Sequence, residues 1–219
     1  MIRLLIYDLD GTLIDSGKDI ANCVNRALKE LGLSELPEQR INFFVGKGAR
    51  NLLENVLPEV LNEKPSEQFV DQTLKLYRNY YRKHLLDETK LFPFVKEVLK
   101  HFESKKQAVI TNKSEDFSRQ ILAGLGVESY FFRIVGGEQA FPKKPSPEAV
   151  FDIMKSAPAL AHETVLIGDS DVDIQTGKNA GIKTIAVTYG FSNHEEIRRS
   201  KPDVILHDLR ELMSHPLLK

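Results

Sequence analysis

The stretch LLIYDLDGT, residues 4–12, indicates the fold class and the first candidate site. Its first four residues are apolar, and Asp8 and Asp10 follow at once beside a glycine, which is typical of a buried strand that ends in a polar turn. Similar short apolar runs occur at Ala108–Thr111, Thr164–Ile167 and Thr184–Val187. Segments with helical periodicity separate these three runs. Strands that alternate with helices predict a doubly wound parallel sheet, a Rossmann-like α/β core.

The segment between the first two predicted strands has a different character. One helical pattern begins near Ser16 and stops at Gly32, and another carries its larger side chains on one face between Phe69 and His84. This segment contains no convincing strand pattern. The sequence therefore predicts an α/β core formed by residues 1–14 and 93–219, with residues 15–92 inserted as a helical domain.

The composition is that of an ordinary soluble globular protein. Hydrophobic residues make up 42% of the 219 positions, charged residues make up 28%, and the formal net charge is -1. This balance gives no general electrostatic attraction to nucleic acid or to an acidic membrane. The apolar N-terminal run is too short for a signal peptide, and no stretch approaches the roughly 20 apolar residues that cross a bilayer. Because Cys23 is the single cysteine, which suits a reducing compartment, we expect a cytoplasmic protein that binds neither nucleic acid nor membranes.

Polar residues gather in the loops that follow the predicted strands. These residues are Asp8 and Asp10 after the first strand, Thr111, Asn112 and Lys113 at the end of the second, and Asp169, Asp171 and Asp173 after the third. Ligands of open parallel sheets bind at the carboxyl ends of the strands, so we expect these side chains to converge. Carboxylates a few ångströms apart repel one another, and a bound cation removes that repulsion. Oxygen ligands without a nearby Cys or His favour Mg²⁺ over Zn²⁺ or copper.

A lysine completes the set of candidate core residues. Lys144 stands before Pro145, shortly after a further apolar run at Tyr130–Val135. A residue before proline is biased to an extended backbone, which can direct the ammonium group into the crevice at the strand ends. A solvated lysine in a proline-rich loop is the alternative.

These four motifs, in this order, resemble those of the haloacid dehalogenase superfamily, and in particular those of its phosphatases. That superfamily has D-x-D-G-T after its first strand, Thr or Ser at the end of the second, a later lysine, and a G-D-x-x-x-D loop. The corresponding residues here are Asp8 to Thr12, Thr111, Lys144, and Gly168-Asp169 with Asp173. The resemblance extends over nearly the whole chain and implies that the inserted helices form a cap domain.

Within the superfamily, the sequence is most similar to phosphoglycolate phosphatases and related small-molecule phosphatases. The similarity rests on Asn112-Lys113, on Lys144-Pro145-Ser146-Pro147, and on Ala180-Gly181-Ile182 with Val187-Thr188-Tyr189-Gly190. Two positions depart from the pattern, because Phe94 stands where relatives often have glycine and Asp171 adds a carboxylate to the last motif. The first departure concerns the hinge of the cap. The second either tunes metal binding or faces solvent.

The resemblance implies the hydrolysis of a phosphate monoester through an aspartyl-phosphate intermediate. Asp8 is then the nucleophile, and Asp10 is the general acid that becomes a general base in the second step. The residues implied to act on the phosphoryl group are Thr111, Lys144, and the backbone N–H groups of Leu9 and Asn112. The implied cofactor is Mg²⁺, with the Asp8 carboxylate, the Asp10 main-chain carbonyl and Asp169 as ligands, and with Asp173 close by, behind these ligands or acting through water.

The inserted domain is expected to select the substrate, because the core contacts only the phosphoryl group. Val45–Arg50 reads as a flexible turn that opens a helical segment. Lys47 or Arg50 can meet a carboxylate such as that of phosphoglycolate. A solvated helix start is the alternative.

The expected partner is a small phosphorylated metabolite, and the expected state is a monomer or a homodimer. Within the same superfamily, a sugar phosphomutase and an inorganic pyrophosphatase remain open. From a different class, a non-catalytic module that senses a phosphorylated metabolite is also open, although such a retired enzyme usually lacks its nucleophile or a metal ligand. Here Asp8, Asp10, Lys144, Asp169 and Asp173 are all present.

Overall fold

The structure, a computed structural model, describes residues 1–137 and 141–218. The chain forms two compact units, Met1–Asp15 with Lys90–Lys219, and Ser16–Thr89. Asp15 and residues 90–92 lie in the first unit rather than in the inserted one, where the sequence placed them. The reason is a short antiparallel ribbon in which β2 (Ile14–Asp15) pairs with β3 (Lys90–Leu91).

The first unit is built on a six-stranded sheet in the order β5-β4-β1-β6-β7-β8, with all neighbours parallel. Its strands are β1 (Leu4–Tyr7), β4 (Lys106–Thr111), β5 (Arg133–Gly136), β6 (Thr164–Gly168), β7 (Lys183–Val187) and β8 (Val204–Leu206). This arrangement confirms the predicted Rossmann-like α/β core. The chain leaves β1 toward β4 and later returns to β6 on its other side, so the order reverses at β1. Such reversal points form ligand-binding crevices at the carboxyl ends of the strands.

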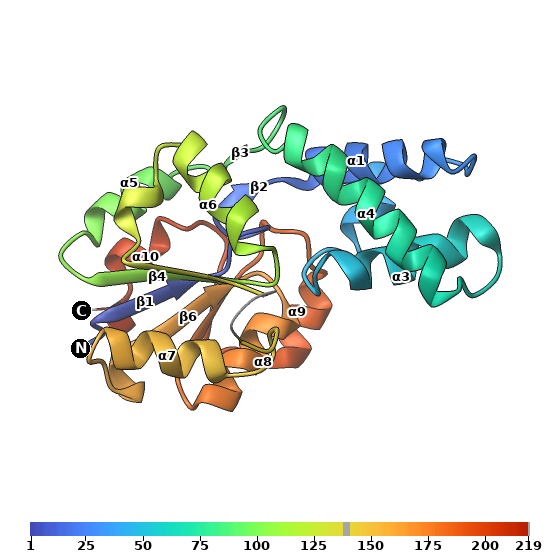
Figure 1. The fold of residues 1–219 in the computed structure, drawn as a ribbon. Coiled ribbons are helices and arrows are strands. Elements are labelled where there is room, and N and C mark those ends of the chain that lie inside the picture. The colour runs from blue at the N-terminus through green and yellow to red at the C-terminus, as the bar shows by residue number, and fades with distance from the viewer. Residues whose placement is uncertain (138–140, 219) are drawn as a thin grey trace. The chain divides into compact units, whose positions relative to one another are not determined.

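Helices cover both faces of this sheet. Figure 1 shows α5 (Val95–His101) and α6 (Glu115–Gly124) on one face, and α7 (Glu148–Ser156) and α8 (Asp171–Ala180) on the other. The four residues of β1 are fully buried between these layers. The rest of the unit consists of α9 (His194–Ser200), α10 (Glu211–Ser214) and the 3₁₀ turns Glu128–Tyr130, Ala161–Glu163 and Pro216–Leu218.

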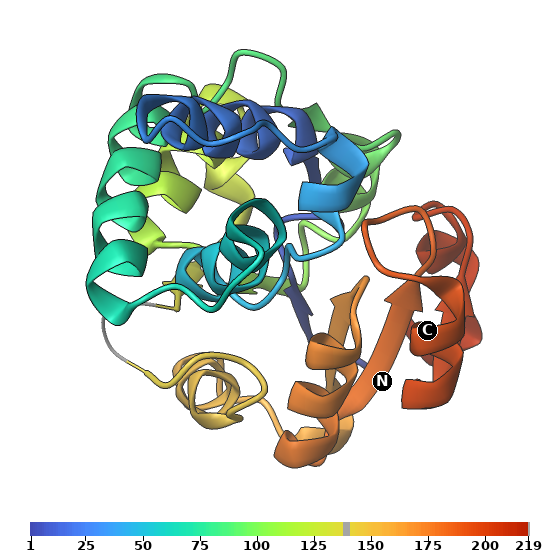
Figure 2. The same ribbon diagram turned by 90° about the vertical axis from the view of Figure 1, so that its right-hand side faces the viewer.

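The inserted unit contains α1 (Gly17–Glu30), α2 (Glu38–Asn42), α3 (Ala49–Leu61) and α4 (Glu67–Lys83). Both predicted helical patterns are confirmed as α1 and α4, which pack against each other (Figure 2). Ser66 caps α4 by accepting a hydrogen bond from the N–H of Phe69 at 3.2 Å. The rings of Tyr77 and Tyr81 stack at 5.4 Å inside this unit, so both belong to its core.

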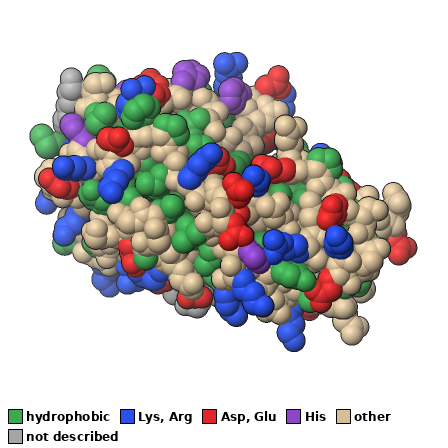
Figure 3. All heavy atoms as spheres, turned by 90° about the horizontal axis from the view of Figure 1, so that it is seen from above, with side chains coloured by type: hydrophobic (Ala, Val, Ile, Leu, Met, Phe, Trp, Pro, Cys, Tyr) green, Lys and Arg blue, Asp and Glu red, His purple; other side chains and the backbone are tan. Residues whose placement is uncertain are grey.

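Two general features bear on possible partners. None of the helices in the described ranges combines the length and the apolar composition that crossing a membrane requires. Acidic and basic side chains are interspersed on the face shown in Figure 3, in agreement with the balanced formal charge.

Candidate active site

Three buried aspartates meet at the carboxyl ends of the central strands. Asp8 follows β1, Asp169 follows β6, and Asp173 lies in the first turn of α8. Each offers a carboxylate oxygen, and these atoms all lie within 4.8 Å of one another. The register explains this convergence, because Tyr7 pairs with Ile167 and the chain continues past both strand ends in the same direction.

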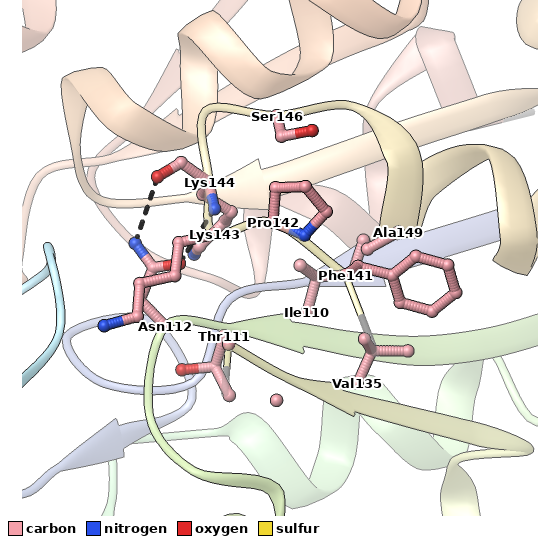
Figure 4. A pocket seen from close by; sticks show the side chains of 12 residues that line it. Ile110, Thr111, Asn112, Val135, Phe141, Pro142, Lys143, Lys144, Ser146 and Ala149 are labelled. Carbon is pink, nitrogen blue, oxygen red and sulfur yellow. Dashed lines mark hydrogen bonds between the residues drawn. The ribbon is translucent and has the colours of Figure 1, made fainter. Parts of the chain in front are cut away.

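Lys144 lies among these carboxylates. Its Nζ is 2.7 Å from Asp8 Oδ1 and 2.6 Å from Asp173 Oδ1, and its side chain is only 2% exposed. Asn112 holds its backbone in place, because Oδ1 of Asn112 accepts from the N–H of Lys144 at 2.8 Å and Nδ2 donates to its carbonyl at 3.3 Å (Figure 4). The sequence therefore predicted correctly that the Lys144 ammonium points toward the polar residues at the strand ends, and the solvated alternative is wrong.

A small pocket lies next to Asn112, behind the Lys144 loop (Figure 4). Much of its lining is hydrocarbon, contributed by the side chains of Ile110, Val135, Phe141 and Ala149. Thr111, Asn112 and Lys144 also line it, so the pocket adjoins residues that the resemblance implies act on the phosphoryl group.

Asp10 lies in the turn after β1, and Thr111 is the last residue of the neighbouring strand β4. Asp10 Oδ1 accepts a charge-assisted hydrogen bond from Lys113 Nζ at 2.6 Å. Thr111 ends β4, is buried, and accepts the N–H of Lys113 at its Oγ1 at 3.2 Å. Both residues lie at the carboxyl ends of adjacent parallel strands, as the sequence predicted.

The carboxylate of Asp169 is held by groups from two other loops. Thr12 Oγ1 donates to Oδ1 at 3.3 Å, and the N–H of Phe191 donates to Oδ2 at 2.8 Å. The chain packs closely here, because a Cβ atom on Gly11 would lie 2.4 Å from Asp169 Oδ2. Gly11 also has φ of +84°, a conformation that other residues rarely adopt. Position 11 therefore requires glycine, because its backbone lies close to Asp169 and has a positive φ.

Asp173 is engaged at both of its oxygens. Oδ1 pairs with Lys144, and Oδ2 accepts from the hydroxyl of Ser170 at 2.5 Å and from its N–H at 3.1 Å. The reciprocal bond from Asp173 N–H to Ser170 Oγ completes a capping box at the start of α8. Asp171, the additional carboxylate of this motif, is exposed, so the solvent-facing alternative holds for it.

The electrostatics of the cluster follow from burial and crowding. Burial raises the pKa of the Asp8 carboxyl well above its ordinary value, and the charge of Asp173 adds to this effect while Lys144 opposes it. Burial and Asp173 also raise the pKa of Asp169 to about 7. Burial disfavours the Lys144 ammonium, but the charges of Asp173 and Asp8 outweigh it and raise the pKa of Lys144. The cluster therefore has fewer positive charges than ionised carboxylates would need for neutrality.

The donor set of this cluster fits a hard divalent cation. All three members offer carboxylate oxygens, and three carboxylates face the single ammonium of Lys144. When all are ionised, two negative charges remain uncompensated. Oxygen-only ligands of this kind suit Mg²⁺, which typically uses one or two carboxylates and retains several waters.

The two cations singled out in the inserted unit have different surroundings. Lys47 is exposed in the turn before α3. The guanidinium of Arg50 pairs with Glu54 at 3.4 Å, with Glu67 at 3.0 Å and with Asp71, all within the same unit. Arg50 therefore has a structural task between α3 and α4 that the sequence did not reveal.

Several contacts that shape the site were not predicted, among them the side-chain contacts of Asn112 and Lys113. The loop after β7 also contributes the Phe191 N–H, and the Tyr189 hydroxyl donates to the carbonyl of Thr12 at 2.9 Å. The motif Thr188-Tyr189-Gly190 was recognised, but the backbone N–H of Phe191 that follows it leaves no signature in residue type that points to Asp169. The signal available for Asn112 was its place directly after Thr111.

The fold and this cluster together define the class of protein: a Rossmann-like α/β enzyme core with a helical insertion and an Asp–Lys site at the strand ends. A family model described as haloacid dehalogenase-like hydrolase matches residues 5–187. The chain belongs to this family, which confirms the predicted superfamily and the prediction of a hydrolase.

Individual relatives match over almost their whole length. The chain is 35% identical to a phosphoglycolate phosphatase of Aquifex aeolicus over 223 aligned residues, covering 100% of both chains. It is 34% identical to a phosphoglycolate phosphatase of Colwellia psychrerythraea, covering 96% of this chain and 95% of the relative. A crystal structure from Haemophilus somnus, described as a predicted phosphoglycolate phosphatase, superimposes with a TM-score of 0.91 at 28% identity and covers 97% of both chains.

Proposed function

We propose that this protein is a magnesium-dependent phosphatase that hydrolyses a small phosphate monoester through an aspartyl-phosphate intermediate. The observation that carries the proposal is the position of Asp8, which is buried, paired with Lys144 at 2.7 Å, and gathered with Asp169 and Asp173. Such a site brings a nucleophilic carboxylate and the positive charge that an anionic substrate needs into one crevice. The similarity to phosphoglycolate phosphatases supports the same activity.

In the first half-reaction, an oxygen of Asp8 forms a bond to phosphorus while the bond from phosphorus to the alcohol oxygen breaks. Asp10 donates a proton to that leaving oxygen, so the alcohol departs neutral. Lys144 offsets the charge of the nucleophile and of the phosphoryl group. The Thr111 hydroxyl and the backbone N–H groups of Leu9 and Asn112 orient the phosphoryl oxygens.

In the second half-reaction, Asp10 takes a proton from water as the water oxygen attacks phosphorus. The bond between phosphorus and Asp8 then breaks, which releases inorganic phosphate and restores both carboxyl groups. Asp8, the Asp10 carbonyl and Asp169 would hold Mg²⁺, and Asp173 lies close behind them. When bound, Mg²⁺ supplies positive charge that reduces repulsion between the carboxylate and the phosphate.

The similarity to phosphoglycolate phosphatases makes a carboxylated substrate such as phosphoglycolate our first choice. The inserted unit then supplies the cation that recognises the carboxylate. Lys47 is the better candidate of the two cations, because Arg50 is already paired with three carboxylates.

The first prediction tests the nucleophile. Asp8→Asn should lower turnover by at least about a thousandfold while the protein still folds and binds inorganic phosphate, because the amide has no charge with which to attack phosphorus. The measurement is phosphate release from phosphoglycolate and from p-nitrophenyl phosphate with Mg²⁺, and again after chelation and re-addition of Mg²⁺. Asp171→Asn is the matched control, since Asp171 is an exposed aspartate of the same site region and should tolerate the change. Near-normal turnover of Asp8→Asn would remove Asp8 from this role.

A further inference from the structure

A second lysine of the site engages a different carboxylate from Lys144. Lys113 Nζ lies 2.6 Å from Asp10 Oδ1, and the two side chains are only 7% and 10% exposed. A charge-assisted hydrogen bond that is this short and this shielded holds its partners more firmly than an exposed ion pair does. The exposed pair Lys183–Asp203, at 2.7 Å, illustrates the difference, because its side chains are 50% and 35% exposed.

The backbone of Lys113 is fixed on both sides. Its N–H donates to Thr111 Oγ1 at 3.2 Å, and its carbonyl accepts from the N–H of Gly137 at 3.1 Å. The neighbouring backbones press closely together, because a Cβ atom on Gly137 would lie 2.8 Å from Asn112 Cα. The ammonium of Lys113 is therefore presented to Asp10 from a rigid loop rather than from a freely moving chain.

Asp10 has a matching constraint on its own side. It lies in the turn between β1 and β2, where it forms an isolated bridge with Ile14 and where the N–H of Gly11 donates to the carbonyl of Ile14 at 2.9 Å. The turn fixes the backbone of Asp10, and the bond to Lys113 restricts rotation of its carboxyl group. Together the two contacts define where the carboxyl oxygens point.

We propose that Lys113 is a positioning residue that holds the Asp10 carboxyl group in the orientation needed for proton transfer. This inference rests on the proposed function, in which Asp10 serves as general acid and then as general base. Charge compensation at Asp8 is already provided by Lys144, so Lys113 adds orientation at the second carboxylate. An oriented acid or base contributes about 10² to 10⁴ in rate, so its misalignment is measurable.

The proposal makes different demands on substrates with different leaving groups. An alkyl ester such as phosphoglycolate needs a proton on its leaving oxygen, whereas nitrophenolate departs without one. Loss of Lys113 should therefore slow the first half-reaction for phosphoglycolate and spare it for p-nitrophenyl phosphate. The second half-reaction, in which Asp10 acts on water, should slow for both substrates.

The test compares Lys113→Met, Lys113→Arg and the control Lys183→Met, which removes an exposed lysine that pairs with an aspartate. For Lys113→Met we expect kcat/KM for phosphoglycolate to fall by about 10- to 100-fold. The pre-steady-state burst of nitrophenolate should keep its rate, and the steady-state rate after the burst should fall. Lys113→Arg should restore most of the activity because it retains the donor, and Lys183→Met should behave as the unmodified protein.

Each remaining outcome overturns the proposal. Equal losses in burst and steady-state rates, or equal losses of kcat/KM for the two substrates, would show that Lys113 supports the site only structurally. Failure of Lys113→Arg to recover kcat/KM for phosphoglycolate has the same meaning. If Lys113→Met does not fold, the kinetics of Lys113→Arg decide the case alone. If the unmodified protein releases no phosphate from any ester, the proposed function itself fails and this inference falls with it.

Discussion

At the scale of single residues, Gly11 shows how a missing side chain places a carboxylate. The backbone of Gly11 lies so close to Asp169 that any Cβ atom would come within 2.7 Å of all three atoms of the carboxylate. Such contacts are closer than atoms tolerate, so either Asp169 or the turn after β1 must shift. Because the same turn carries Asp8 and Asp10, the shift would change the geometry of the whole cluster.

We predict that Gly11→Ala weakens Mg²⁺ binding by at least about tenfold, because it displaces one carboxylate ligand. The matched control is Gly126→Ala, since Gly126 also has positive φ, +69°, but nothing lies within 4 Å of its added Cβ. Both variants should lose about 1 kcal/mol from the backbone conformation. Only Gly11→Ala should lose metal affinity in calorimetric titration with Mg²⁺. Equal affinities in the two variants would contradict the proposed role of Asp169.

Residue type and position were enough to find part of the site. Asp8, Asp169 and Lys144 could be predicted because strand ends collect functional side chains, and because crowded carboxylates need a cation. The tasks of Asn112 and Arg50 could not be predicted, because they depend on which partner lies opposite in the folded chain. Asn112 forms hydrogen bonds with the backbone of Lys144, which is 32 positions away in the chain. Arg50 in α3 pairs with Asp71 in α4.

At the scale of elements, a buried carboxylate joins the two ends of the inserted unit. Asp19, in the first turn of α1, is only 1% exposed. Its oxygens accept from the N–H of Glu88 at 3.0 and 3.1 Å, and Oδ2 accepts from the N–H of Thr89 at 2.8 Å and its hydroxyl at 2.7 Å. The start and the end of the unit, which are 70 positions apart, are thus fastened to one side chain.

We predict that Asp19→Ala lowers the free energy of unfolding by about 2 kcal/mol or more, because it leaves buried donors without an acceptor. Amide hydrogen exchange at Glu88 and Thr89 should become faster at the same time. Asp87→Ala, which removes a more exposed aspartate from the same unit, should change stability by about 0.5 kcal/mol or less. Unchanged hydrogen exchange at positions 88 and 89 would show that the hydrogen bonds to Asp19 do not stabilise this end of the unit.

The turn before α3 carries the prediction about substrate choice. Lys47→Ala should raise KM for phosphoglycolate by about tenfold and leave KM for p-nitrophenyl phosphate unchanged, because only the first substrate has a carboxylate. Arg50→Ala should instead lower the Tm, because it breaks ion pairs between α3 and α4. The reverse pattern, with Arg50→Ala selective for the carboxylate, would show that Arg50 leaves its partners to bind substrate.

The elements themselves were predicted with uneven success, for physical reasons. Leu4–Tyr7 is a strand over the predicted residues because a fully buried parallel strand is apolar throughout. The run Tyr130–Val135 begins as a 3₁₀ turn, and its strand covers only Arg133–Gly136. The edge strand β8 has only three residues and was not predicted, because so short a run has no measurable periodicity.

Phe94, which stands where relatives often have glycine, adopts φ of +64°. Its ring centroid lies 3.7 Å from Cζ of the Arg210 guanidinium.

At the scale of the whole molecule, the charge cluster links stability to pH. The carboxyl of Asp169 has a pKa raised to about 7 by burial and by Asp173, against 3.8 ordinarily. Between these two values the folded chain retains a proton that the unfolded chain releases. This carboxyl therefore contributes stability that is present below the ordinary pKa and is lost as the pH rises through about 7. The raised pKa of Asp8 acts in the same direction.

Mg²⁺ should oppose this dependence, because it binds the ionised carboxylates and competes with their protons. Below pH 7, each unit by which the pH falls should weaken the apparent affinity for Mg²⁺ by about tenfold for each proton displaced. At a concentration 100 times the Kd, the ion stabilises the fold by about 2.7 kcal/mol, and a tenfold weaker affinity reduces this to about 1.4 kcal/mol. We therefore predict that the rise in Tm on addition of Mg²⁺ is clearly larger at pH 8 than at pH 6.

The experiment records thermal unfolding across this pH range with Mg²⁺ and with a chelator. Asp169→Asn should flatten the fall in stability between pH 4 and 7 and should remove most of the response to Mg²⁺, because it eliminates both the titrating proton and a ligand. Asp203→Asn, which changes a carboxylate paired with Lys183, should keep the response to Mg²⁺. A shift in Tm that is independent of pH, or one that survives in Asp169→Asn, would place the ion elsewhere, because a cation held by these carboxylates must displace their protons in order to bind.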